Sequence, residues 1–157
     1  MYKFIRATHS QARIKYLLKF DGGADGNPGP GGSGCAIYKI SLSKPPQLYV
    51  ELGTYLAYTT NNEAEYTGLI SGLTWCRDNQ IKNVVIEGDS MLVVKQISKE
   101  WKCNAPNLKP LLDNVFTLLN DFHHVGIRHI YREENEHADK LSKDVRGIKS
   151  NILNVLL

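Results

Sequence analysis

Two aspartates stand where predicted strands end. Asp21 follows the apolar run 14–20 (IKYLLKF), and Asp89 follows the strand-like segment 83–88 (NVVIEG). In open α/β sheets, ligand sites gather outside the carboxyl ends of the strands. We therefore expect both aspartates in one site. Turn and helix-capping roles are the alternatives, and for Asp89, which precedes Ser90 and a predicted helix, capping fits equally well.

Three further acids lie near predicted helix starts. Glu63 and Glu65 begin a helix predicted at 63–79 and fall on opposite flanks of its apolar stripe, at ~100° per residue. This periodicity does not choose between them. Asp139 lies in the first turns of the helix predicted at 135–145, at the edge of its buried face.

A cluster of such acids has a chemistry of its own. Carboxylates within a few ångströms raise each other's pKa, so the ionised set is stable only beside a cation. Oxygen ligands suit Mg²⁺ or Mn²⁺, and two such ions ~3.5–4 Å apart can activate a water and stabilise the leaving oxygen of a phosphodiester. The three cysteines lack zinc-ligand spacing, and the sequence has no GxxxxGK phosphate-binding loop. The acids therefore predict metal-dependent phosphodiester hydrolysis.

The acids need a sheet that brings strand ends together, and hydropathy predicts one. The Gly/Pro-rich segment 21–34 predicts a turn region. The order β-β-β-α-β-α-α-β-α predicts an α/β fold, a five-stranded mixed sheet flanked by helices. Strands are expected at 14–20, 35–41, 47–55, 83–88 and 125–131, and helices at 63–79, 90–98, 108–122 and 135–145.

Composition narrows the class of protein. The 157 residues suggest one domain, and 42% hydrophobic with 22% charged residues is ordinary for a soluble globular protein. No apolar run approaches the ~20 residues of a membrane span, and no secretion signal is seen. We expect an intracellular protein, cytoplasmic or nucleus-associated, with no membrane partner. The acid-poor N-terminus also leaves organelle import open.

Basic residues are concentrated at the N-terminus. Five of the 19 Lys and Arg residues precede Asp21, whereas all 16 acids lie from Asp21 onward, which leaves 14 basic residues there. A basic segment beside a near-neutral body suits a polyanion; a solvated tail is the alternative. We divide the chain into a basic N-terminal extension (1–13), one catalytic domain (14–145) and an apolar C-terminal tail (146–157).

Four segments carry the acids in a characteristic order. They are FDGGADGNPGPGGSGCAIY, TTNNEAEYTGLISGL, IEGDSMLVVKQI and REENEHADKLS. Each resembles a motif of the type 1 ribonuclease H family, and the match covers about residues 14–145. The resemblance implies a ribonuclease H-like fold. It also implies that the metal-binding catalytic acids are Asp21, Glu65, Asp89 and Asp139, which favours Glu65 over Glu63.

The resemblance also implies a nucleic-acid surface. Small residues would let the backbone approach a ribose 2′-OH. Asn27 and Thr60 are expected at a DNA-strand phosphate, and Asn61 and Asn62 at base edges. Each position is also compatible with a turn former or helix cap. The full set is Gly22, Gly26, Asn27, Pro28, Thr60, Asn61 and Asn62.

Bacterial-type members of the family carry a histidine-bearing loop shortly before the last acid, and this chain lacks it. Tyr131 to Asn135 join strand and helix directly. The candidates for an accessory role are Arg132, which could bind phosphate, and His137, which could move a proton.

The basic helical protrusion of many members is also reduced here. After the third motif, Lys99, Lys102 and Lys109 are scattered along a short connection. Trp101 in this connection predicts a packed aromatic, with stacking on nucleic acid as the alternative. We hypothesise that the basic N-terminal segment partly compensates for the missing protrusion.

The resemblance implies an endoribonuclease that hydrolyses the RNA strand of an RNA–DNA hybrid and leaves 5′-phosphate ends. Its cofactor would be Mg²⁺, with Mn²⁺ as substitute and two ions per active site, and the chain is expected to be a monomer. The alternatives are a catalytically weak hybrid- or RNA-binding module and a nuclease with additional double-stranded RNA activity. The repulsive acid cluster argues against the binding module, because binding alone does not require it.

Overall fold

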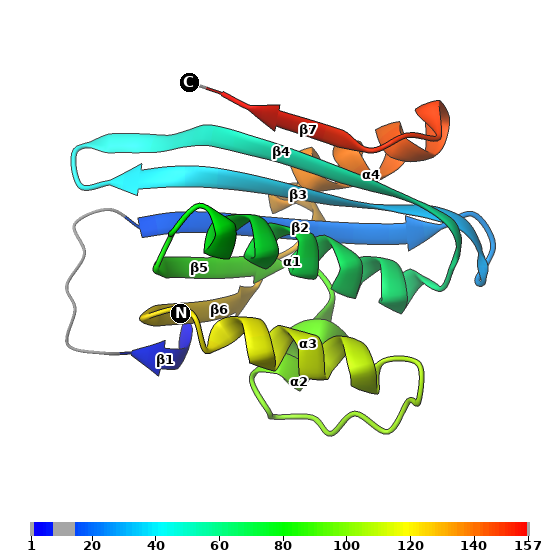
Figure 1. The fold of residues 1–157 in the computed structure, drawn as a ribbon, viewed down its shortest axis with the longest axis horizontal. Coiled ribbons are helices and arrows are strands. Elements are labelled where there is room, and N and C mark those ends of the chain that lie inside the picture. Colours follow the sequence, from blue (N-terminus) through cyan, green and yellow to red (C-terminus); the bar gives the residue numbers. More distant parts are fainter. Residues whose placement is uncertain (1, 8–14, 157) are drawn as a thin grey trace.

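A mixed sheet of seven strands organises the described residues, 2–7 and 15–156 of a computed structural model (Figure 1). The strand order is β1-β6-β5-β2-β3-β4-β7. Strands β2, β5 and β6 are parallel neighbours, and the other pairs are antiparallel. The strands are β1 (Lys3–Ala7), β2 (Lys15–Ala24), β3 (Gly29–Ser41), β4 (Lys44–Thr59), β5 (Asn83–Gly88), β6 (His124–His129) and β7 (Ile152–Val155).

Helices cover both faces of this sheet. Helices α1, α2 and α3 pack together on one face, and α4 lies behind β3 and β4 on the other (Figure 1). No described helix is long and apolar enough to cross a membrane. The helices are α1 (Asn61–Asp78), α2 (Met91–Ile97), α3 (Lys109–Leu119) and α4 (Glu136–Ile148), with a 3₁₀ turn η1 (Arg132–Glu134) before α4.

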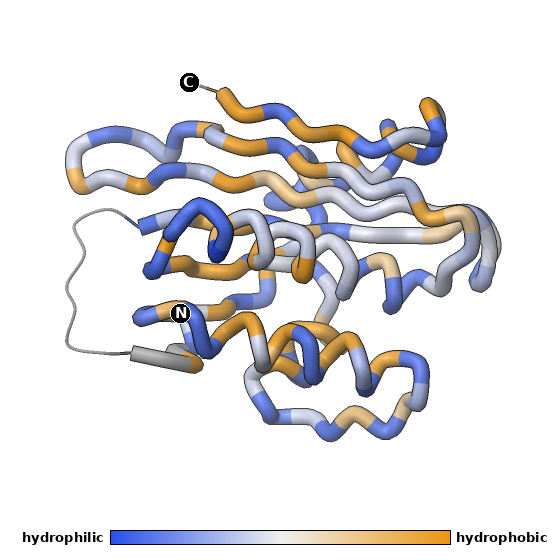
Figure 2. The backbone as a smooth tube through the Cα atoms, viewed as in Figure 1, coloured by the Kyte–Doolittle hydropathy of each residue, from blue (hydrophilic) through white to orange (hydrophobic). Residues whose placement is uncertain are grey.

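The core lies between the central strands and the α1 face. All six residues of β5 are buried, and Figure 2 shows the apolar run along this strand. Such a run is typical of a parallel strand that is covered on both faces. Leu18, Phe20, Tyr66 and Leu69 are fully buried beside it. Asp21 was predicted to follow the strand at 14–20 but lies inside β2, one residue after the pairing of β2 with β5 ends at Phe20. Asp89 directly follows β5, so buried strands fix both positions.

The predicted number of five strands is wrong, because two short edge strands complete the sheet. β1 pairs with β6, and β7 pairs with β4. Both lie in segments that were predicted as an extension and a tail. With five and four residues, they are too short for alternation to reveal, and an edge strand depends on a partner distant in sequence. Residues 8–14 lie outside the described residues.

The Gly/Pro-rich segment 21–34 is also not the turn region that was predicted. β2 runs to Ala24 and β3 starts at Gly29, so only 25–28 turn. Helix backbones approach these strands closely instead. A Cβ on Gly22 would lie 2.3 Å from the carbonyl carbon of Ala64 in α1, and one on Gly34 would lie 2.1 Å from the Ala138 oxygen in α4. These glycines therefore let α1 and α4 bring their acids to the end of β2.

Candidate active site

Acids from three separate elements converge at the ends of β2 and β5. Asp21 in β2, Glu65 in α1 and Asp89 after β5 place carboxylate oxygens within 4.8 Å of one another. Asp21 and Glu65 are only 7% and 8% exposed. Asp139 in α4 hydrogen-bonds to Asp21 and lines the same cleft, which encloses about 460 Å³. The structure thus brings the four predicted acids together.

The geometry separates Glu63 from Glu65. Glu63 forms a capping box with Thr60: its Oε1 accepts from the Thr60 backbone N–H at 2.8 Å, and its own N–H donates to Thr60 Oγ1 at 3.1 Å. Its carboxylate therefore satisfies the N-terminus of α1. Glu65, half a turn further on, points into the acid cluster.

Helix capping does not account for Asp89. The N-cap of α2 is Ser90, whose Oγ accepts from the Val93 N–H at 3.2 Å. The Asp89 carboxylate instead accepts a long hydrogen bond from Asn135 Nδ2 at 3.5 Å. It is free to face the other acids.

Burial and mutual repulsion perturb the cluster. Burial, together with the Asp89 charge, raises the pKa of Asp21 to about 7. Burial and the charges of Asp21 and Asp89 raise the pKa of Glu65 well above its usual range. When no cation is bound, protons on these acids therefore reduce the repulsion among them.

The outer two acids are less perturbed. Burial raises the pKa of Asp89, although the Asn135 hydrogen bond and the Arg132 charge oppose that rise. For Asp139, burial alone would raise the pKa, but hydrogen bonds from Lys143 and Asp21 bring it below its usual value. The Lys143 ammonium lies 2.9 Å from the Asp139 carboxylate. Charge is thus partly balanced at the rim and unbalanced at the centre.

The centre of the cluster fits a hard divalent cation. Glu65 Oε2 is buried and has no hydrogen-bond partner among the described residues. A buried carboxylate oxygen without a partner is costly, and a metal ion removes that cost. The donors are all oxygens, as Mg²⁺ or Mn²⁺ prefers. Asp21, Glu65 and Asp89 are the residues that would hold it.

Three basic side chains line the same cleft. Arg132 lies on η1, and Lys143 and Arg146 lie on α4. Arg132 is therefore placed where an accessory residue is needed. His137 is not among the cleft residues; its Nε2 lies 2.6 Å from Glu51 Oε2 in β4. The sequence had suggested Arg132, whereas Lys143 and Arg146 were missed because helical lysines and arginines are common on solvated faces.

The two predicted nucleic-acid segments are hydrogen-bonded to each other. Asn27 Oδ1 accepts from the Asn61 N–H at 3.0 Å, and Asn61 Oδ1 accepts from the Ala24 N–H at 2.9 Å. Gly26, with a φ of +83°, takes a conformation that favours glycine. Gly26, Asn27, Pro28, Asn61 and Asn62 are exposed, Thr60 and Gly22 half-buried.

Asn135 is a site residue that the sequence had suggested only as a helix cap. It precedes α4 but makes no side-chain capping bond. Its Nδ2 donates to the Phe20 carbonyl at 2.9 Å and to Asp89, and the residue is 1% exposed. It therefore joins the ends of β2, β5 and α4. Its distance of 115 residues from Phe20 explains why local pattern did not show this.

The structure also describes the two segments where the sequence lacks the histidine-bearing loop and the full basic protrusion. Between β6 and α4 only η1 intervenes, so no histidine-bearing loop is inserted. No helix is formed in the described connection between α2 and α3. Trp101 was predicted as a packed aromatic, but it is 47% exposed. Lys3, a basic residue of the N-terminal segment, pairs with Glu100 at 2.9 Å, while Arg13 lies outside the described residues.

Known proteins are similar to this chain in sequence and fold. A family model described as reverse transcriptase-like matches residues 19–145. Bifunctional protein Rv2228c of Mycobacterium tuberculosis is 35% identical over 135 residues, 83% of this chain and 35% of that protein. The solved N-terminal RNase H domain of that protein, fused to maltose binding protein, has a TM-score of 0.80 at 32% identity, covering 86% of this chain and 95% of that one. Ribonuclease HI of Halobacterium salinarum is 35% identical over 80% of this chain and 61% of its own length.

The chain belongs to the ribonuclease H type 1 family. Its fold is the ribonuclease H-like fold that was predicted. The chain spans only about a third of the mycobacterial protein and three-fifths of the halobacterial one. Another member of known structure, LC11-RNase H1 in complex with an RNA/DNA hybrid, has a TM-score of 0.74 at 28% identity, covering 86% of this chain and 99% of that one.

Proposed function

We propose that this ribonuclease H hydrolyses the RNA strand of RNA–DNA hybrids by a reaction that depends on divalent metal. One observation carries the proposal. Three carboxylates from β2, α1 and the end of β5 lie within 4.8 Å, with a buried Glu65 oxygen that has no described protein partner. Pure binding would not require so unfavourable a cluster.

Each acid has a distinct part in this proposal. Asp21, Glu65 and Asp89 hold Mg²⁺, with Mn²⁺ as substitute. Asp139 supplies a further carboxylate ligand at the edge of the cleft. Two ions bound there would supply a nucleophilic water and stabilise charge on the leaving oxygen. Asn135 fixes Asp89 relative to β2, so that the ligands stay in register.

Basic groups at the rim suit the phosphates of the substrate. Arg132 can bind a phosphate through two N–H groups. Lys143 is already held by Asp139, and Arg146 by Asp25 at 3.1 Å. Their charges partly offset those of the acids and would draw the polyanion to the cleft.

Substrate choice is assigned to the two hydrogen-bonded segments. The bonds between Asn27, Asn61 and Ala24 hold the two segments together, with the Asn27 and Asn61 side chains on one exposed surface. Such a surface suits the minor groove of a hybrid, where the ribose 2′-OH identifies the RNA strand. The hybrid bound by LC11-RNase H1 supports this substrate, and the products are expected to carry 5′-phosphates.

The test is cleavage of an end-labelled RNA–DNA hybrid with Mg²⁺, Mn²⁺ or chelator. We expect cutting of the RNA strand only with metal, and a loss of more than ~100-fold in Asp21→Asn, since even outer partners of metal ligands can cost that much. Asp121→Asn, a change at an exposed acid remote in sequence from the motifs, is the matched control. Cutting in chelator, or equal cutting by Asp21→Asn, would refute the proposal.

A further inference from the structure

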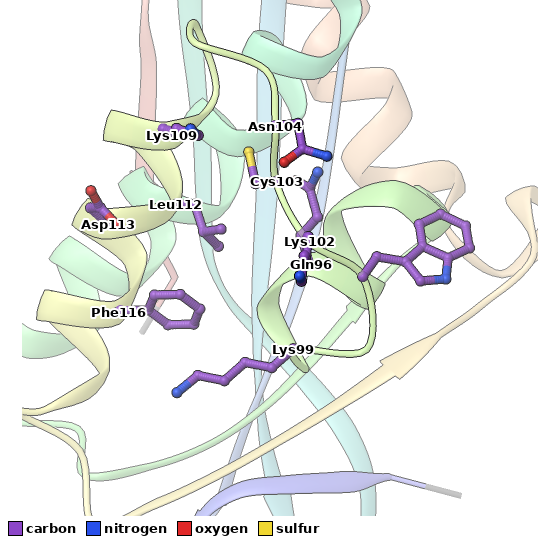
Figure 3. A pocket seen from close by; sticks show the side chains of 10 residues that line it. Gln96, Lys99, Lys102, Cys103, Asn104, Lys109, Leu112, Asp113 and Phe116 are labelled. Carbon is purple, nitrogen blue, oxygen red and sulfur yellow. The ribbon is translucent and has the colours of Figure 1, made fainter.

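A second cleft lies on the connection between α2 and α3, and the proposed reaction does not use it. This basic pocket encloses about 440 Å³ (Figure 3). Its lining includes three lysines, an indole and two apolar residues of α3: Lys99, Trp101, Lys102, Lys109, Leu112 and Phe116.

The lysines of the basic pocket are not neutralised. Among the described residues, Lys99, Lys102 and Lys109 have no carboxylate within ion-pair distance, whereas their neighbour Lys95 pairs with Glu100 at 3.2 Å. Asp113 also lines the pocket, but its side chain lies across it from Lys102 (Figure 3). The pocket therefore carries a net positive charge and suits an anion.

The pocket also offers a surface for a flat ring. Trp101 is 47% exposed, and Leu112 and Phe116 form an apolar wall. The Lys99 ammonium lies 5.1 Å from the centre of the Phe116 ring, which holds the charge beside this wall (Figure 3). An exposed indole next to unpaired lysines combines stacking with charge, the two terms that govern binding of single-stranded nucleic acid.

We propose that the basic pocket binds a single-stranded nucleic-acid segment, with one base against Trp101 and its phosphates on Lys99, Lys102 and Lys109. The single strand is favoured over a duplex because stacked and paired bases would not present a face to the indole. The identity of the polymer rests on the proposed function: such a segment would be the unpaired extension of a hybrid. An acidic peptide is the competing occupant.

Trp101 makes the proposal measurable by fluorescence, because the chain has only two tryptophans. The other, Trp75, packs edge-on against Tyr49 with ring centres 5.7 Å apart, so Trp75→Phe keeps an aromatic contact and leaves Trp101 as the reporter. The titrant is a short oligo-dT in chelator. DNA and the absence of metal separate binding from cleavage, so failure of this proposal differs from failure of the proposed function.

We expect quenching of Trp101 by oligo-dT, and about tenfold weaker binding in Trp101→Ala, as measured by anisotropy of a labelled oligonucleotide in an otherwise wild-type chain. Three phosphate contacts predict a slope of log K against log salt of about −2, and the double variant Lys102→Gln/Lys109→Gln should flatten it to about −0.7.

Lys44→Gln/Lys149→Gln removes the same charge from two other exposed lysines and should leave the slope unchanged. Lys44 starts β4 beside the end of β3, at the opposite end of the strands from Asp21. No quenching by oligo-dT, or equal flattening by both double variants, would overturn the proposal. Quenching only by an acidic peptide would assign the pocket to a protein partner and also overturn it.

Discussion

Asp21→Asn should stabilise the metal-free protein at neutral pH while it abolishes activity. The pKa of Asp21 rises from 3.8 to about 7 on folding, first through burial and then through the Asp89 charge. For an acid whose pKa is raised, the linked stability is fully present below pH ~4 and is lost as the pH rises through about 7. A rise of that size corresponds to about 4 kcal/mol at pH 8.

The gain in the variant should be smaller than this full value. Asparagine keeps an oxygen for the Gly22 N–H but changes the hydrogen bonds with Glu65 and Asp139, each worth about 1 kcal/mol net. A gain of about 2–3 kcal/mol remains. At the ~2 kcal/mol per molar typical of urea, the unfolding midpoint should increase by about 1 M.

The assay is urea unfolding in chelator between pH 4 and 8, followed by circular dichroism. Near pH 4, where the raised pKa of Asp21 costs wild type little, Asp21→Asn should be less stable by the about 1–2 kcal/mol of its changed hydrogen bonds. The order should reverse as the pH rises, whereas Asp121→Asn should track wild type. Mg²⁺ at about 100 times its Kd should stabilise wild type by about 2.7 kcal/mol and close the gap. If the free energies of unfolding of wild type and Asp21→Asn differed by the same amount at every pH in this range, folding would not raise the pKa of Asp21 and the reasoning would be refuted.

Three further changes test how the fold positions the site. Glu63→Ala should cost about 1 kcal/mol of stability through the lost capping box yet retain hybrid cleavage, whereas Glu65→Gln should retain the fold and lose cleavage; the reverse pattern would exchange their roles. Asn135→Ala should cost about 1–3 kcal/mol in urea unfolding and reduce kcat, because the Phe20 carbonyl loses its donor; unchanged values would remove it from the site. Gly34→Ala should destabilise by about 1–3 kcal/mol because its Cβ meets the Ala138 oxygen. Gly147→Ala, with open space around it, should stabilise α4 by up to about 1 kcal/mol, and equal thermal shifts for both alanines would contradict the close-packing role.

Hydropathy patterns predicted the helices and strands whose own residues show a clear helical or strand periodicity. The strand at 83–88 has the predicted bounds, and the order of helices and strands between residues 15 and 148 is as expected. Features that depend on distant partners were not predictable in this way. β1 and β7 need the edges of β6 and β4, and Asn135 needs the Phe20 carbonyl, 115 residues away.

The acids show the same division between local and distant causes. Motif resemblance selected Glu65, but the physical reason lies in the capping box that occupies Glu63 and in the backbone contact at Gly22 that seats α1 on β2. Hydropathy could not show either, because a capping carboxylate and a metal ligand are equally polar. The distinction appears only when the partners of each oxygen are known.

The same close contacts explain why the site is unfavourable without metal. Glycines at 22 and 34 remove the side chains that would keep α1 and α4 away from β2 and β3, so helix packing carries Glu65 and Asp139 into the repulsive cluster. Core burial around Leu18, Phe20 and Ile86 supplies the free energy that opposes this repulsion. Stability and cation affinity should therefore be coupled: any change that loosens α1 or α4 should relieve the acids, lower the pKa of Asp21 and weaken metal binding together.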